Sequence, residues 1–188
     1  MMSKCSIKIK PSYVEIHFKV KRRKRGVSLM SDKISVFDVA NFYISKAEPG
    51  SGSLMTPLRL QKLVYYSQAW SLAILGEPLF NGAFLAWVHG PVNYDLWRKY
   101  KEYSYRPIPP RKFAAHKFSE DQLDLLEEVW EVYGQFDAKY LEQLTHNERP
   151  WQEAREGYAP GDRCNVIISM DTMKEYYSGL VTGGEDQI

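Results

Sequence analysis

The chain of 188 residues is 44% hydrophobic and 26% charged, as expected for one globular domain, and no apolar run is long enough to span a membrane. Its net charge of +2 conceals an asymmetry, because residues 1–30 hold nine Lys or Arg and one Glu, a net of +8, which leaves −6 for the rest. The body is therefore mildly acidic, which argues against sequence-independent nucleic-acid binding. Cys5 and Cys164 lie far apart and no apolar secretory segment opens the sequence, so we expect a cytoplasmic protein with free thiols.

The first thirty residues differ in character from the rest. Residues 14–20 alternate apolar and polar side chains, which predicts a strand, and residues 21–25 read Lys-Arg-Arg-Lys-Arg. Two functional interpretations are a nucleic-acid-binding arm and an electrostatic tether to an acidic partner. A third is a mis-assigned start, since a Lys/Arg/Gly run just upstream of Met30 is what a translated ribosome-binding site would look like. We expect residues 1–30 to form a disordered or non-native basic extension and residues 31–188 to form the domain.

The first predicted helices of the body carry clear start signals. Ser35 opens a helix over residues 36–47 with a capping-box pattern, and Thr56 caps a second helix that ends at Gly76. Apolar residues cover most of the circumference of the second helix, which predicts a place at the centre of the fold. Three polar residues are expected to mark its solvent-exposed side: Arg59, Gln61 and Lys62.

The middle of the chain predicts a hairpin and a short helix. Residues 79–80 and 84–88 are predicted to be strands around an Asn-Gly turn, after which a His-Gly-Pro-Val sequence turns the chain. A third helix is predicted over residues 94–103, and the proline-rich residues 105–110 are predicted to be extended.

Three more helices follow, with Ser119, Asp137 and Ser169 as predicted N-caps and Gly179 as the last stop. A short helical turn beginning at Pro150 separates the last two. The sequence therefore predicts a mainly α fold, a compact bundle of about six helices around a central buried helix with one short β-hairpin.

Recognised catalytic and metal-binding patterns do not occur in the sequence. The body has three histidines, His89, His116 and His146, with no two at i,i+4, and it lacks CxxC, HExxH, GxSxG and phosphate-binding glycine motifs. Cys164 has no local nucleophile signature, and the paired carboxylates of the fourth helix are expected to be solvated. We therefore expect no catalytic residue, metal or cofactor, with an uncharacterised enzyme using His89 and His146 as an alternative.

Two segments, residues 87–92 and 145–151, each place a His, a Pro and a Trp near the end of an element. One interpretation is structural: each Trp fills the core and each His satisfies buried backbone groups. The other is a partly polar aromatic patch of the kind that protein-binding hot spots use. With neighbouring aromatics added, the candidate partner-binding residues are Trp87, His89, Pro91, Trp97, Tyr103, Tyr105, His146 and Trp151.

Several ordered motifs give the chain a family resemblance. They are Ile-Ser-Val-Phe-Asp-Val-Ala (34–40), Met-Thr-Pro-Leu-Arg-Leu-Gln-Lys-Leu-Val-Tyr-Tyr-Ser-Gln-Ala (55–69), Trp87 with His-Gly-Pro-Val (89–92), residues 141–146, and Pro150-Trp151. Together they resemble the Panacea antitoxin domain, whose founding members include the SocA and the phage-associated GepA proteins. The resemblance covers about residues 33–178 and leaves out residues 1–30, which agrees with a start at Met30.

The resemblance implies a cytoplasmic antitoxin, often carried on prophages or mobile elements, that neutralises a cognate toxin encoded by an adjacent gene through protein contact. One founding member delivers its toxin to the ClpXP protease, but this sequence has no recognisable protease-docking feature. The family offers no catalytic residue to carry over. Partner contacts are expected outside the shared motifs, in the aromatics of the third helix, in residues 105–117 and after Gly157. A nucleic-acid-binding regulator using residues 21–25 is the remaining alternative.

Overall fold

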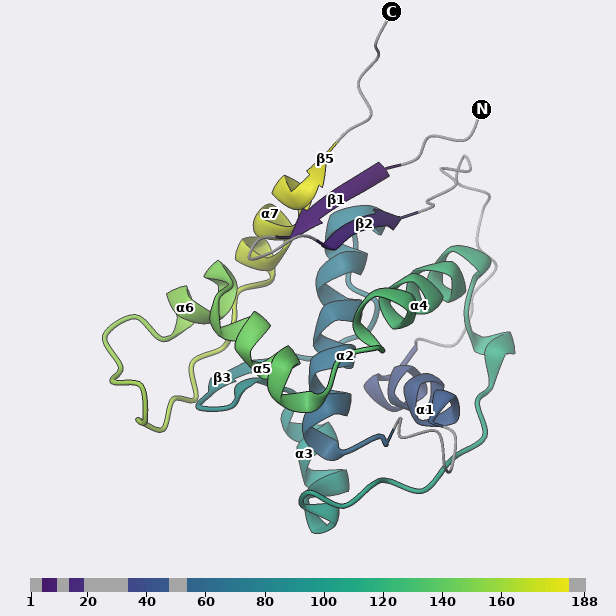
Figure 1. Cartoon of the computed structure of the whole chain (residues 1–188), viewed down its shortest axis with the longest axis horizontal. Coiled ribbons are helices and arrows are strands. Elements are labelled where there is room, and N and C mark those ends of the chain that lie inside the picture. The colour runs from purple at the N-terminus through teal and green to yellow at the C-terminus, as the bar shows by residue number, and fades with distance from the viewer. Residues whose placement is uncertain (1–4, 10–13, 19–33, 48–53, 183–188) are drawn as a thin grey trace, which may run out of the picture.

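The computed structural model describes residues 5–9, 14–18, 34–47 and 54–182 (Figure 1). The α-helices within these ranges are α1 (Val36–Lys46), α2 (Pro57–Trp70), α3 (Tyr94–Tyr100), α4 (Glu120–Tyr133), α5 (Ala138–His146), α6 (Arg149–Ala154) and α7 (Met170–Leu180). The strands are β1 (Cys5–Ile9), β2 (Val14–Phe18), β3 (Leu85–Trp87), β4 (Gly90–Val92) and β5 (Val181–Thr182). The predicted mainly α class is confirmed. None of the described helices combines the length and hydropathy that a membrane span requires.

Helix α2 is the axis of the fold, and α1, α4, α5 and α7 pack around it (Figure 1). Every side chain from Arg59 to Trp70 is buried, which confirms the predicted central helix. Thr56 caps its start, and a π-helical turn over Ser71–Leu75 continues it to Gly76, whose positive φ of 81° ends it.

The predicted solvent-exposed side of α2 does not exist. Arg59, Gln61 and Lys62 are only 6%, 4% and 0% exposed. Each instead reaches the backbone of a neighbouring segment: Arg59 donates to two carbonyls, and Lys62 donates to the carbonyl of Pro91 at 3.1 Å. Gln61 donates to the carbonyl of Asn93 and accepts from its N–H. Because these polar groups are hydrogen-bonded, their burial costs far less than that of unpaired groups.

The hairpin lies later in the sequence than predicted. Its strands are β3 and β4, and the turn is Val88-His89 rather than Asn-Gly. The amide of Gln68 on α2 explains the difference, because its Oε1 accepts from the N–H groups of Leu79 and Phe80 at 3.0 and 3.3 Å, and its Nε2 donates to the Phe80 carbonyl. These two residues are therefore attached to α2 and not to a strand.

The amino-terminal strands belong to a second sheet that the sequence did not predict. Strand β1 pairs antiparallel with β2 and, on its other edge, with β5, where Ile7 lies opposite Val181. Strand β2 falls within the predicted residues 14–20. Residues 21–25 and Met30 lie outside the described residues, so the division at residue 30 stays a prediction.

Helix caps are where the sequence was most informative. All five predicted N-cap side chains accept a backbone N–H from the first helical turn: Ser35, Thr56, Ser119, Asp137 and Ser169. Two of them, Ser35 and Ser119, form complete capping boxes. Helix α7 passes through the predicted stop at Gly179 and ends one residue later.

A buried carboxyl group surrounded by tyrosines joins α2, α4 and α7. Glu148 accepts hydrogen bonds from the hydroxyls of Tyr66 at 3.2 Å and Tyr177 at 2.7 Å. The rings of Tyr66 and Tyr133 stack at 3.8 Å, and Trp70 donates to the Tyr133 hydroxyl at 3.0 Å. Burial raises the pKa of Glu148 to about 8, and the two tyrosine hydroxyls lower the pKa only in part.

This buried carboxyl predicts a pH-dependent stability. The unfolded chain ionises Glu148 near its usual pKa of 4.5 while the folded protein keeps the proton up to about pH 8, so this contribution to stability is lost as the pH rises through that window. Glu148→Gln keeps the shape and removes the titration, so the stability of wild type relative to the variant should fall by up to about 1.4 kcal/mol per pH unit between pH 5 and 8. Lys62 has a folded pKa of about 7 and titrates equally in both proteins, so it does not affect the difference in stability between them.

The measurement is urea unfolding of both proteins near pH 5 and near pH 8. Glu153→Gln, at an exposed carboxylate on α6, is the matched control and should give the same difference from wild type at both pH values. A constant difference between wild type and Glu148→Gln would show that this carboxyl is already ionised in the fold.

The central position of α2 predicts a large cavity effect. Leu63 is fully buried whereas Leu54 is 50% exposed. Leu63→Ala should therefore cost about 2–5 kcal/mol in free energy of unfolding, and Leu54→Ala less than about 0.5 kcal/mol. Thermal and urea unfolding of the two variants compares the same chemical change at both sites. Equal losses would contradict the burial of α2.

Candidate functional site

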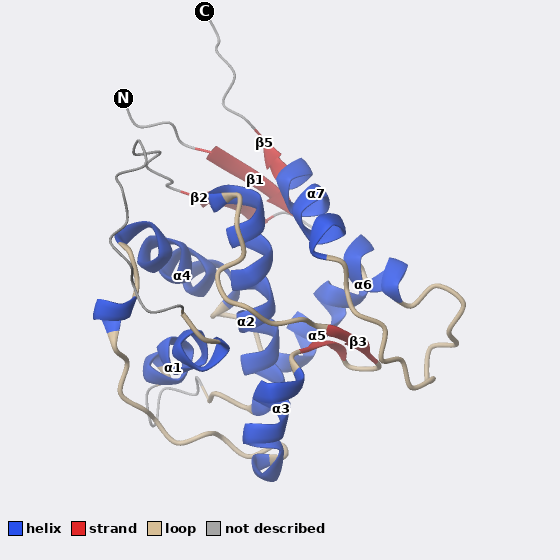
Figure 2. Ribbon diagram, turned by 180° about the vertical axis from the view of Figure 1, so that it is seen from behind, coloured by secondary structure: helices blue, strands red, loops and turns tan. Residues whose placement is uncertain are grey.

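The β3–β4 hairpin is held unusually close to the helices beneath it. Gly90 has a φ of +90°, and a Cβ added there would lie 2.6 Å from Nζ of Lys62 and 2.7 Å from Oγ1 of Thr145. Both its backbone conformation and the space around it therefore require glycine. Figure 2 shows the hairpin beside α5, with α3 and α6 close to it. The His-Gly-Pro-Val sequence thus brings the hairpin backbone into contact with α2 and α5.

A network of charged groups lies under the turn of the hairpin. Burial lowers the pKa of Lys62 to about 7, although the nearby carboxylate of Glu142 raises it. Glu142 is itself buried and accepts from Nδ1 of His89 at 3.2 Å and from Nζ of Lys139 at 2.9 Å. Burial alone would raise the pKa of Glu142, but these two hydrogen bonds outweigh it and lower the pKa. The network ties the turn of the hairpin to α5.

A second set of contacts holds the hairpin from α6. The indole of Trp151 donates to the Trp87 carbonyl at 3.0 Å and stacks on His146 at a centroid distance of 4.1 Å. Arg155 is 6% exposed, donates to the Ala86 carbonyl at 2.9 Å and lies over the Trp151 ring. Burial lowers the pKa of His146. For His146 and Trp151 the contacts agree with the structural interpretation, because both rings pack beneath the hairpin.

The same arginine organises the loop that follows α6. Its Nη2 donates to the carbonyls of Ala159 and Asp162 at 2.9 and 3.0 Å. Cys164, a free thiol that is 1% exposed, donates to the Ala154 carbonyl at 3.6 Å. Arg155 therefore links the loop, α6 and the hairpin into one unit.

Aromatic rings gather on the outer side of the hairpin. Trp87 and Trp97 meet edge to face at 5.3 Å, and Tyr94 lies 5.5 Å from Trp97. The Trp87 indole donates to Asn165 at 3.1 Å, and Nζ of Lys101 lies 5.3 Å from the Trp97 centroid. Each of the two tryptophans keeps part of its surface in solvent.

The register of β3 extends this aromatic group. Leu85 and Trp87 alternate with the fully buried Ala86, so they share the outer face. Ile167 bridges to Leu85 as a third antiparallel neighbour and is 60% exposed. We call the resulting apolar surface the hairpin face; it consists of Leu85, Trp87, Tyr94, Trp97 and Ile167.

The other predicted binding residues lie in different surroundings. His89 is exposed at the turn and Pro91 is buried. Tyr103 is half-buried with its ring 6.3 Å from Tyr100, and Tyr105 is 84% exposed. The structure thus joins Trp87 to Trp97, places Tyr103 and Tyr105 beyond α3, and leaves Pro91 inaccessible.

The alternative pairing of His89 with His146 finds no support in these contacts. His89 bonds Glu142, His146 stacks on Trp151, and no described hydrogen bond joins the two histidines. Within the described ranges, no group of three or more His, Cys, Asp or Glu side chains is arranged to hold a metal ion.

Sequence reasoning missed the buried polar residues that position the hairpin, namely Lys62, Glu142 and Arg155. A local signal exists for Lys62, because an apolar run of four residues follows it directly on the helix. None exists for Glu142 and Arg155, whose helices present ordinary charged surfaces in sequence.

The close approach at Gly90 predicts a strong substitution effect. Gly90→Ala should cost about 1–3 kcal/mol, because the new methyl group displaces Lys62 and Thr145 from a backbone that already has positive φ. Gly161→Ala is the matched control, since nothing lies within 4 Å of its added Cβ. Urea unfolding measures both, and an equal effect at the two positions would contradict the packing described at Gly90.

Comparison with known proteins supplies the family. Residues 60–152 match the family model described as Antitoxin SocA-like, Panacea domain, while no curated protein and no solved structure gives a match. The matched range contains residues 60–70 of α2, the hairpin, α3 and the Trp151 contact beneath the hairpin. The predicted family resemblance is thereby confirmed by the match of residues 60–152 to the SocA-like antitoxin, Panacea domain model.

Proposed function

We propose that this protein is the antitoxin of a toxin–antitoxin module and neutralises a protein toxin by direct contact. The observation that carries the proposal is the family match over residues 60–152. The toxin is encoded by an adjacent gene and met in the cytoplasm, and a prophage or mobile element is the natural carrier of the pair. Because the family is one of antitoxins, binding rather than catalysis is the proposed activity.

The hairpin face supports this proposal as the toxin-binding surface. Trp and Tyr are the side chains most enriched among the residues that dominate protein–protein affinity. Here two tryptophans and a tyrosine share one partly exposed cluster. The backbone of β3 is fixed from beneath by Trp151 and Arg155. A surface held in this way loses little conformational entropy when a partner binds.

Sequestration is the simpler mechanism, with delivery of the toxin to a ClpXP-type protease as the alternative. The two differ in their dependence on the protease: sequestration protects cells that lack it, whereas delivery does not. A regulator acting through residues 21–25 is the third alternative, and its residues lie outside the described part of the chain.

The proposal predicts growth rescue. Expression of the neighbouring reading frame should arrest growth, residues 1–188 should restore it, and the two proteins should co-purify. Trp97→Ala should weaken the complex by at least about tenfold without changing the melting temperature appreciably, because Trp97 is a partly exposed anchor of the hairpin face.

Tyr140→Ala is the matched control, since Tyr140 is an exposed aromatic residue on α5 outside the hairpin face. It should rescue growth as wild type does. Toxicity that the wild-type protein leaves unrelieved would remove the proposed function at this locus. Rescue that persists with Trp97→Ala would move the binding surface elsewhere.

A further inference from the structure

The folded body is electrically divided. Residues 94–117 contain seven Lys or Arg and two Asp or Glu, a net of +5. Residues 118–188 contain five Lys or Arg and sixteen Asp or Glu, a net of −11. The basic stretch comprises α3 and the connection to α4, which we call the basic segment. A mildly acidic body thus carries one concentrated region of positive charge.

Three cations of the basic segment lie against aromatic rings, whereas Arg98 and Lys117 pair with the carboxylates of Asp95 and Asp38. Nζ of Lys99 lies 4.1 Å from the Phe37 centroid, Nζ of Lys101 lies 5.3 Å from that of Trp97, and the guanidinium of Arg111 lies 5.8 Å from that of Tyr100. These three cations are exposed. The pKa of Lys99 is lowered by burial and then by the neighbouring Arg111, although the carboxylate of Asp38 raises it in part. A ring leaves a cation's charge uncompensated, so it stays available to an anionic partner.

A strained turn in the basic segment presents an exposed tyrosine. The N–H of Arg106 donates to the carbonyl of Tyr103 at 2.8 Å and closes a four-residue turn. Ser104 is the second residue of this turn, with φ of 53° and ψ of −113°, and it is the one non-glycine residue with positive φ in the described part of the chain. Tyr105 follows it and is 84% exposed. Strain of this kind costs about 1–3 kcal/mol and concentrates at functional positions.

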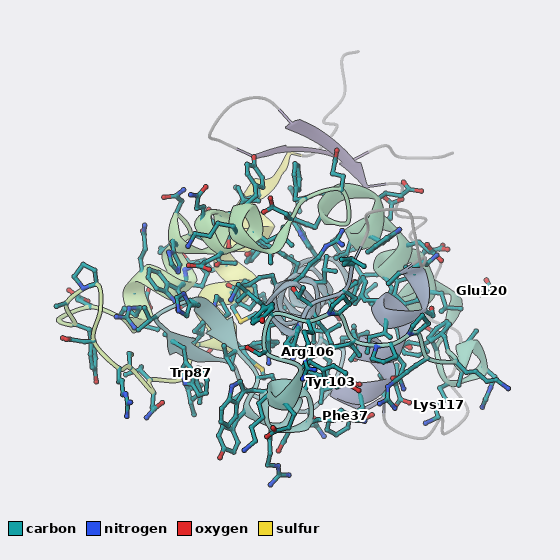
Figure 3. The ribbon with its side chains drawn as sticks, turned by 60° about the horizontal axis from the view of Figure 1, so that its bottom comes forward. Phe37, Trp87, Tyr103, Arg106, Lys117 and Glu120 are labelled. Atoms are coloured by element: carbon teal, nitrogen blue, oxygen red, sulfur yellow. The ribbon has the colours of Figure 1, made fainter. Side chains whose placement is uncertain are left out.

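The basic segment also adjoins the hairpin face. Trp97 belongs to both, and it contacts Trp87 on one side and Lys101 on the other. In Figure 3, Trp87, the pair Tyr103 and Arg106, and then Lys117 follow one another across the side of the molecule that comes forward.

We propose that the basic segment binds an acidic segment of the toxin, with Tyr105 and Trp97 as aromatic anchors and Lys101, Arg106 and Arg111 as charge contacts. The proposal rests on the proposed function and names the chemistry of the partner. Charge complementarity selects the partner, and the tyrosine, tryptophan and arginine side chains are those that supply most energy in protein interfaces.

The limited extent of the positive charge favours a protein segment over a nucleic acid. Lys117 is followed within three residues by Glu120, the first residue of α4. Helix α4 then contributes six carboxylates and no Lys or Arg. A nucleic acid that continues beyond the basic segment would meet this negative helix within about one Debye length. A short acidic segment of a protein can bind the basic segment without reaching α4.

The test uses the full chain and the purified product of the neighbouring reading frame, carrying an inactivating substitution where toxicity requires one. The double variant Lys101→Glu/Arg106→Glu should lose at least about tenfold in affinity and show a shallower dependence of the dissociation constant on salt. The matched control Arg163→Glu/Lys174→Glu makes the same charge change at two exposed residues elsewhere, and it should change affinity by less than about threefold.

Two single variants examine the turn. Tyr105→Ala should lose about tenfold or more in affinity with an unchanged melting temperature, because the side chain is exposed and not part of the core. Ser104→Gly keeps the turn, relieves the backbone strain, and should bind the toxin as wild type does with an equal or higher melting temperature.

The outcomes separate the two proposals. If the wild-type protein neither binds nor neutralises the product, the proposed function fails and this inference fails with it. If wild type rescues growth while the two double variants bind equally well, the acidic-segment inference is overturned and the proposed function stands. Tight binding of a single-stranded oligonucleotide that the Lys101/Arg106 reversal abolishes, with toxin binding unchanged, would assign the basic segment to nucleic acid.

Discussion

The fold depends on how the polar side of α2 is satisfied in the interior. A helix that is buried all round is stabilised when its polar groups are paired, since an unpaired buried group costs roughly 1–3 kcal/mol. Gln61 and Lys62 are paired in this way with the backbone of β4 and the residue after it. Gln68 does the same for the segment before β3. Helix α2 thus serves as the template on which the hairpin and its flanking segments are positioned.

This arrangement gives the hairpin a rigid base with an aromatic outer side. Beneath β3, Arg155 and Trp151 hold backbone carbonyls from α6, and above it Trp87 and Trp97 face outward together. The two histidine-containing segments therefore have different structural roles. The segment around His146 supports the hairpin, whereas the segment around Trp87 presents a surface. The structural interpretation agrees with the contacts of His146 and Trp151, whereas the binding interpretation of the segment around Trp87 stays a prediction.

Much of the architecture was readable from sequence because it is encoded locally. An N-cap such as Ser119 with Gln122 specifies a helix start through groups three residues apart, and all five such predictions agree with the structure. The failures involve partners far along the chain. Gln68 diverts Leu79 and Phe80 from a strand across 11 and 12 residues, and Lys62 finds its acceptor 29 residues away. Such pairings depend on tertiary packing and leave no periodic signal.

In the candidate site, too, locally encoded features could be predicted from sequence and long-range contacts could not. Trp87 and Trp97 could be named as candidates from sequence because large aromatic residues near loops are common anchors, whereas Glu142 and Arg155 look in sequence like ordinary surface charges. Only the fold reveals that each is buried and attached to the hairpin, the first through His89 and the second through the Ala86 carbonyl. The charge division between residues 94–117 and 118–188 is visible in sequence, but the strained turn at Ser104 is not.

The buried thiol of Cys164 offers a way to observe motion in this region. It lies one residue before Asn165, whose side chain bonds Trp87, and only 1% of its surface is accessible. A thiol reagent therefore reaches it only when the loop separates from α6, so the rate of modification measures how often that separation occurs. In a protein whose Cys5 is replaced by Ser, a bound partner that covers the adjacent aromatic surface would slow that rate. The rate at which Cys164 is modified thereby reports how often the region around the hairpin opens.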